Sequence, residues 1–109
     1  MKLEIKAFNI ISEDWGEEID DFFLSCQVDI GFKDEIGAEI YSLDVVSPKR
    51  LLGLVVGNDV EIGKGYFITA DYNKNLICNK IEKLIDREIS EDNKYNIFNE
   101  ISVYFKKQV

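Results

Sequence analysis

The stretch Tyr41-Ser-Leu-Asp-Val-Val-Ser-Pro-Lys-Arg-Leu-Leu52 decides how this chain folds. Apolar side chains recur at every second position from Tyr41 to Val45, which is the pattern of a half-buried strand. Ser47 can cap a following helix through its hydroxyl, and Pro48 suits the first helical position because no amide hydrogen is needed there. The stretch therefore predicts a strand, a capped stop and a short helix over residues 49–56.

Two more strands are predicted before this stretch. Lys2 to Phe8 alternates between apolar and charged residues. Phe22 to Phe32 places an unbroken apolar face on its even-numbered positions, and a slip of one residue would bury Asp29, so the register is well specified. Residues 9–21 are expected to form a loop or a single helical turn, and residues 33–37 a hairpin turn.

The second half of the chain adds one strand and then helices. Tyr66 to Tyr72 alternates and is apolar on both faces, which indicates a central strand. From Asn73 to Ile89 the apolar residues recur at three-to-four spacing, as on an amphipathic helix. Ser90 can cap a second helix. The apolar stripe of that helix either continues to Phe105 or gives way to a short strand from Ser102.

These elements predict an α+β fold. A chain of 109 residues forms one domain, so residues 1–109 are expected to fold as a unit. Four strands followed by helices indicate an antiparallel sheet of about four strands, with the C-terminal helices packed on one face.

Charge is concentrated in the first half of the chain. Residues 1–45 carry 12 acids against three lysines, a net charge of −9, whereas residues 46–109 carry nine acids and ten bases. The net charge of the whole chain is −8. An acidic surface repels nucleic acid and anionic membranes and attracts a basic protein. Solubility alone is the other interpretation of this charge.

The composition argues against an enzyme. The sequence contains no histidine, which removes the commonest general base, the usual Ser-His and Cys-His nucleophiles and the commonest zinc ligand. Gly63-Lys64-Gly65 lacks the spacing of a phosphate-binding loop and is interpreted as a turn. No catalytic residue, metal ion or cofactor is predicted.

A cytoplasmic location is expected. The sequence passes from Met1 directly into a strand pattern, and no apolar run approaches the roughly 20 residues of a membrane span. The two cysteines, Cys26 and Cys78, fall in apolar patterns, which favours reduced and buried thiols over a redox pair.

The acidic segment around the only tryptophan is the candidate binding surface. Six of the ten residues from Ser12 to Asp21 are acidic, and Trp15 lies among them. Carboxylates can steer a basic protein toward an exposed aromatic anchor; alternatively, Trp15 folds onto the core and the acids are merely solvated. The candidate protein-binding residues are Glu13, Asp14, Trp15, Glu17, Glu18, Asp20 and Asp21, with Asp34 and Glu35 as neighbours if the next hairpin lies close.

The segment Val46-Ser-Pro-Lys-Arg-Leu-Leu52 resembles the strand-then-Thr/Ser-Pro-Lys segment of the immunity protein 8 family. Other parts of that family pattern are matched in order. Lys2–Ile5 is similar to its opening strand, Phe22–Phe32 to its long second strand, and Gly65–Tyr72 to its strand-to-helix junction. Members of the family are small cytosolic antitoxins encoded beside polymorphic toxins, including those of contact-dependent growth inhibition systems.

The resemblance implies an immunity protein that binds and neutralises the C-terminal domain of a cognate toxin. It transfers a role and an architecture but no binding residue. Many toxins of such systems are nucleases with basic clefts, and the acidic first half fits a basic toxin of this type, since its acids could occupy sites that otherwise hold phosphates. The alternative function is an acidic adaptor or regulatory module that binds proteins without neutralising a toxin.

Overall fold

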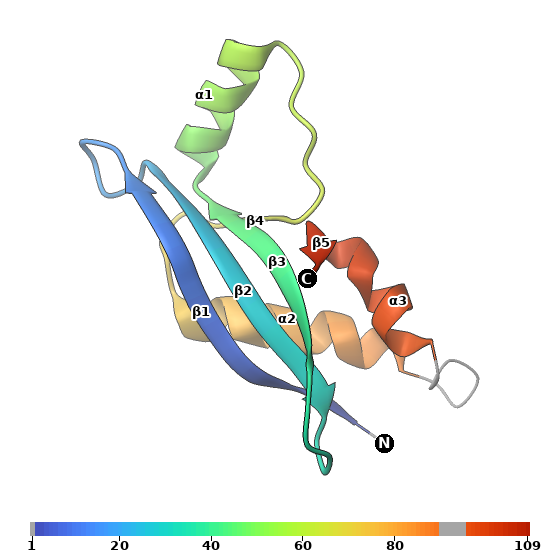
Figure 1. The fold of residues 1–109 in the computed structure, drawn as a ribbon. Coiled ribbons are helices and arrows are strands. Elements are labelled where there is room, and N and C mark those ends of the chain that lie inside the picture. The colour runs from blue at the N-terminus through green and yellow to red at the C-terminus, as the bar shows by residue number, and fades with distance from the viewer. Residues whose placement is uncertain (1, 90–95) are drawn as a thin grey trace.

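A computed structural model describes residues 2–89 and 96–109, and it confirms the α+β fold. Figure 1 shows a long, twisted sheet with α2 lying across one face and α1 projecting beyond one end. The elements in chain order are β1 (Leu3–Trp15), β2 (Phe22–Phe32), β3 (Glu39–Val46), α1 (Pro48–Asn58), β4 (Tyr66–Ile68), α2 (Lys74–Glu88), α3 (Ile97–Ile101), a 3-10 turn (Ser102–Tyr104) and β5 (Lys107–Gln108).

The sheet has the strand order β1-β2-β3-β4, with β5 pairing on the same side of β3 as β4. The first three strands form antiparallel pairs, whereas β4 runs parallel to β3. A parallel neighbour requires a crossover connection, and α1 lies within that connection. The prediction of a central strand from Tyr66 to Tyr72 was wrong, because β4 ends at Ile68 and lies at the sheet edge.

The first strand is longer than predicted. Residues 9–15 were expected to form a loop or helical turn, but β1 continues to Trp15, which pairs with Phe22. The register shifts twice along this pairing, between Ile5 and Ala7 and between Ile10 and Ser12. Residues 11–15 are exposed, so neither face of this part of β1 is apolar, and the extension shows no alternation that would predict a strand.

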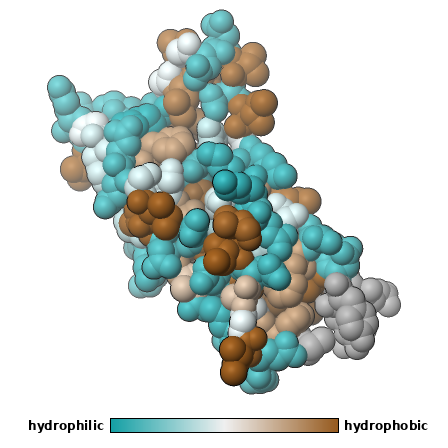
Figure 2. All heavy atoms as spheres, viewed as in Figure 1, coloured by the Kyte–Doolittle hydropathy of each residue, from teal (hydrophilic) through white to brown (hydrophobic). Residues whose placement is uncertain are grey.

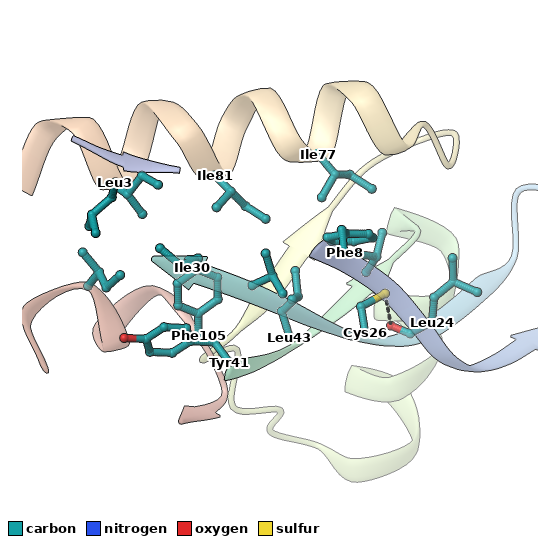
Figure 3. Close-up of a cluster of buried hydrophobic side chains, with 14 of the residues drawn as sticks. Leu3, Phe8, Leu24, Cys26, Ile30, Tyr41, Leu43, Ile77, Ile81 and Phe105 are labelled. Carbon is teal, nitrogen blue, oxygen red and sulfur yellow. Dashed lines mark hydrogen bonds between the residues drawn. The ribbon is translucent and has the colours of Figure 1, made fainter. Parts of the chain in front are cut away.

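The core lies between α2 and one face of the sheet (Figure 3). The even-numbered residues of β2 from Phe22 to Ile30 are all buried, as the sequence pattern predicted. Ile77, Ile81 and Ile85 face them from one side of α2. Full burial of an isoleucine side chain contributes about 1.5–3 kcal/mol, so this stripe supports the packing of α2.

The C-terminal segment closes the other part of the core. The ring of Phe105 is buried, with its centroid 4.9 Å from that of Tyr41, whose hydroxyl donates to the carbonyl oxygen of Phe98 at 2.8 Å. The helical stripe ends before Phe105, and the short strand begins only at Lys107. The predicted Ser90 cap lies outside the described residues. Within those residues, no helix combines the length and the apolarity needed to cross a membrane.

Both cysteines are free thiols. Cys26 is fully buried, and burial, reinforced by the carboxylates of Asp44 and Glu13, raises the pKa of its thiol to about 12. Burial also raises the pKa of Cys78, which is half-buried on α2. Both side chains therefore act as small apolar groups at neutral pH.

Candidate protein-binding surface

Residues 13–21, here called the acidic hairpin, join β1 to β2 at the end of the sheet from which α1 projects (Figure 1). The turn is closed by two backbone hydrogen bonds, from Gly16 N to Asp21 O at 2.8 Å and from Asp21 N to Glu18 O at 3.1 Å. The structure thus gathers the first seven predicted residues into one region. Six of them are exposed, and Asp21 is half-buried.

Trp15 packs on the core and is also partly exposed, so both predicted arrangements of this side chain hold in part. Its ring packs on the buried ring of Phe22, with 5.0 Å between the centroids. Its indole nitrogen donates to the carboxylate of Glu13 at 3.1 Å, and 43% of the residue remains exposed. The side chain is therefore fixed against the core while it still presents a surface to solvent.

Lys49, in the first turn of α1, contacts the turn of the acidic hairpin. Its ammonium nitrogen lies 2.7 Å from a carboxylate oxygen of Glu18 and 3.7 Å from one of Asp20. The hydrogen bond to Glu18 raises the pKa of Lys49, so the lysine stays charged. These groups are exposed, and the pairs contribute little to stability, but they set the position of the turn relative to α1.

Arg50 makes a second and less exposed link. Its Nε donates to Asp21 at 2.6 Å and its Nη1 donates to Asp14 at 2.9 Å, and its side chain is only 18% exposed. The hydrogen bonds to Asp21 and Asp14 raise the pKa of the guanidinium. One side chain of α1 thereby contacts both arms of the hairpin, at Asp14 in β1 and at Asp21 just before β2.

Ser47, which follows β3, joins β2 and α1 through one buried hydroxyl. Its Oγ accepts hydrogen bonds from the backbone nitrogens of Phe22 and Arg50, each at 3.1 Å. The predicted helix cap is confirmed, with Pro48 inside the first turn. The bond from Phe22 could not be predicted, since it depends on the first residue of β2 lying beside the end of β3.

The acidic hairpin retains a negative charge after these contacts. It carries six carboxylates, and the two cations of the first α1 turn leave a net charge of −4. Glu17 has no ion pair within the part of the chain that the structure describes. A concentration of one charge on a projecting end attracts an oppositely charged protein and raises its association rate.

Asp34 and Glu35 do not belong to this surface. They lie in the turn between β2 and β3, at the opposite end of β2. An 11-residue strand spans roughly 35 Å at about 3.3 Å per residue, so the two hairpins are far apart. The second hairpin does not lie close to the first, so Asp34 and Glu35 are not neighbours of the acidic hairpin.

The sequence interpretation missed the apolar surface of α1. This helix buries none of its residues, although Leu51, Leu52, Leu54, Val55 and Val56 make it largely apolar. Figure 2 shows apolar side chains among hydrophilic ones on this projecting end. The signal was present in the sequence, because the apolar face of an amphipathic helix normally packs against a core.

The sheet face opposite α2 also carries a shallow groove, lined in part by Ser25, Gln27, Ser42 and Lys107. At its edge the buried carboxylate of Asp44 accepts from Lys106 Nζ at 3.0 Å. The buried acid is thus paired. Residues 2–89 and 96–109 contain no group of three His, Cys, Asp or Glu side chains that could hold a metal ion.

Comparison with known proteins gives one match. A family model described as Immunity protein 8 matches residues 3–107, nearly the whole chain, which confirms the resemblance drawn from the sequence. No curated protein and no solved structure shows a significant match.

Proposed function

The chain belongs to the immunity protein 8 family, and we propose that it neutralises a basic toxin domain by binding it with the acidic hairpin. Membership makes the chain an immunity protein, whose partner is a cognate toxin protein. The proposal adds that the toxin is the C-terminal domain of a polymorphic toxin, as in contact-dependent growth inhibition. It also adds that this domain is of nuclease type and that neutralisation takes place in the cytoplasm.

The observation that supports this proposal most is the net charge of −4 on the acidic hairpin, which remains after its ion pairs with Lys49 and Arg50 are counted. Nucleases bind phosphates with lysine and arginine side chains, and carboxylates are the protein groups that complement those cations. The ion pairs to Lys49 and Arg50 order the hairpin before binding. Such preorganisation lowers the entropy lost on association.

Neutralisation by this route is steric and electrostatic, and it needs no reaction by the immunity protein. A carboxylate array placed over a basic cleft occupies the positions of substrate phosphates. A stable interface buries about 800 Å² on each partner, which is more than a tenth of the 6,915 Å² surface of this chain. Such an interface takes about 20 to 30 residues from each partner, so it must extend beyond the hairpin of residues 13–21.

Co-expression tests the function itself. The toxin domain encoded beside the gene for this chain should arrest growth when expressed alone, and the chain should restore growth. A catalytically inactive toxin domain should bind the purified chain with a Kd in the nanomolar range or below. Continued arrest with both proteins folded and expressed would refute the proposal.

Charge reversal tests the position of the surface. Glu17→Lys combined with Asp20→Lys should slow association by about tenfold at low salt and reduce its dependence on salt. Asp34→Lys combined with Glu35→Lys is the matched control, because it changes the net charge equally at the other end of β2. Equal association rates for the two double variants, measured by stopped-flow fluorescence, would place the surface elsewhere.

A further inference from the structure

The helix α1 has an apolar face, yet it buries none of its residues. Leu52, Val55 and Val56 have helical spacing and form one apolar face, with Leu52 65% and Val56 73% exposed. Single exposed apolar residues are common on proteins and need no explanation. A contiguous apolar face on a helix that buries nothing indicates an interaction site.

This apolar face adjoins the acidic hairpin. Lys49 lies three residues before Leu52 and seven before Val56, so all three lie on the same side of α1. The ammonium group of Lys49 contacts Glu18 and Asp20. The exposed turn of the hairpin therefore lies at the N-terminal end of the apolar face, and a partner that touches one element meets the other.

We propose that Leu52, Val55 and Val56 form the apolar centre of the toxin-binding surface, with the acidic hairpin as its charged rim. The inference rests on the proposed function and identifies the chemistry of the partner. The toxin domain would present an apolar patch beside a cluster of lysine and arginine side chains. Apolar centres with polar rims are the usual arrangement of protein interfaces, and the centre supplies most of the affinity.

The charge of this end favours a toxin over a second copy of the chain. In a symmetric pair built on α1, each apolar face would bring its acidic hairpin with it, with a net charge of −4 on each side. Like charges in an interface oppose association. A basic toxin domain, in contrast, is attracted by the negative charge of the acidic hairpin.

Exposure at this face allows a test that leaves the fold intact. Leu52→Gln with Val56→Gln removes the apolar face, and both replaced side chains lie mostly in solvent. Leu76→Gln is the matched control, since Leu76 is 62% exposed but lies on α2. Thermal unfolding should show all three proteins equally folded, and binding is measured with the inactive toxin domain encoded beside this gene.

The Leu52→Gln/Val56→Gln variant should bind about a hundredfold more weakly, with the loss mainly in the dissociation rate and the salt dependence of association unchanged. Leu76→Gln should bind within about threefold of the wild type. A double variant that binds as tightly as the wild type overturns this inference alone. A wild-type chain that does not bind the toxin domain overturns the proposed function, and this inference with it.

Sedimentation of the free chain gives the remaining outcome. A monomeric wild-type chain agrees with a surface kept for the toxin. A wild-type dimer that Leu52→Gln/Val56→Gln converts to a monomer would assign the apolar face to a second copy, and would overturn the inference.

Discussion

The helices α1 and α2 begin in the same way and end with different roles. Each starts at a side chain that accepts from a backbone nitrogen three residues on, from Arg50 in the case of Ser47 and from Leu76 in the case of Asn73. Yet α2 buries three isoleucines against the sheet, whereas α1 buries none of its residues. A cap and an apolar composition build a helix, and the topology decides what its apolar side covers.

The positions of α2 and α1 in the chain explain this difference. After β4 the chain returns across one face of the sheet as α2, which packs on the apolar side chains of β1 and β2. In contrast, α1 lies in the crossover from β3 to β4, beyond the end of the strands (Figure 1). The domain is thus closed by α2, and the apolar side of α1 remains available.

The largest expected effect separates the two helices directly. Ile81→Ala should lower the free energy of unfolding by about 2–5 kcal/mol, because it leaves a cavity under α2. Leu52→Ala, at an exposed site of α1, should change it by less than about 0.5 kcal/mol. Urea unfolding followed by circular dichroism measures both, and equal losses would contradict the division of roles.

The second-largest loss of stability is expected at Ser47, which links α1 to the rest of the fold. Ser47→Ala removes a helix cap and leaves the backbone nitrogen of Phe22 without its buried acceptor, so we expect a loss of about 1–3 kcal/mol. Ser47→Thr keeps the hydroxyl and serves as the control. If urea midpoints show no loss for the alanine variant, the hydroxyl does not hold the two elements together.

The core face should show a pH dependence of stability between pH 8 and pH 10, a range in which Lys49 of α1, whose pKa is raised, keeps its charge. The thiol of Cys26 has a pKa of about 12 in the folded chain and ordinarily about 9, so the folded chain holds the proton more tightly. Its contribution to stability is complete below pH 9 and is lost as the pH rises toward 12. Between pH 8 and pH 10 the wild type should lose about 1 kcal/mol more than Cys26→Ala. Parallel urea curves for the two proteins would contradict this.

The smallest effect concerns the ion pairs at the base of the hairpin. Arg50→Gln should cost about 0.5–1 kcal/mol at low salt and less in 1 M salt, since one partner, Asp14, is well exposed. Lys49→Gln, whose side chain is more exposed, should cost less still. A loss for Arg50→Gln that does not change with salt would assign its role to packing of the aliphatic stem.

The parts of the fold that follow from local pattern were predictable. The register of β2 and the span of α2 each depend on a single uninterrupted periodicity, and the Ser47 stop depends on two adjacent residues, a capping hydroxyl and a proline. The far part of β1 was not predictable, because residues 11–15 are all exposed and so carry no alternation of apolar and polar side chains. The strand β4 is shorter than predicted because Ile68 pairs with Val46, the last residue of β3, so no partner strand remains beyond it.

For the surface, the sequence located the acidic hairpin but not its neighbours. The separation of Asp34 and Glu35 follows from the strand between the hairpins, since successive turns of an antiparallel sheet lie at opposite ends. The contacts of Arg50 join residues 29 and 36 positions apart, which no local pattern encodes. That the hairpin binds a toxin remains a prediction.

The projection of α1 has a consequence for how the family can diversify. Because α1 buries nothing and the hairpin turn is exposed, substitutions at this end change the surface at little cost in stability. On the proposed toxin-binding surface, residues can therefore change with a changing toxin, whereas replacing the buried isoleucines of α2 would cost stability. The residues that stabilise the fold and the residues proposed to recognise the toxin are thus different sets, and one set can change without the other.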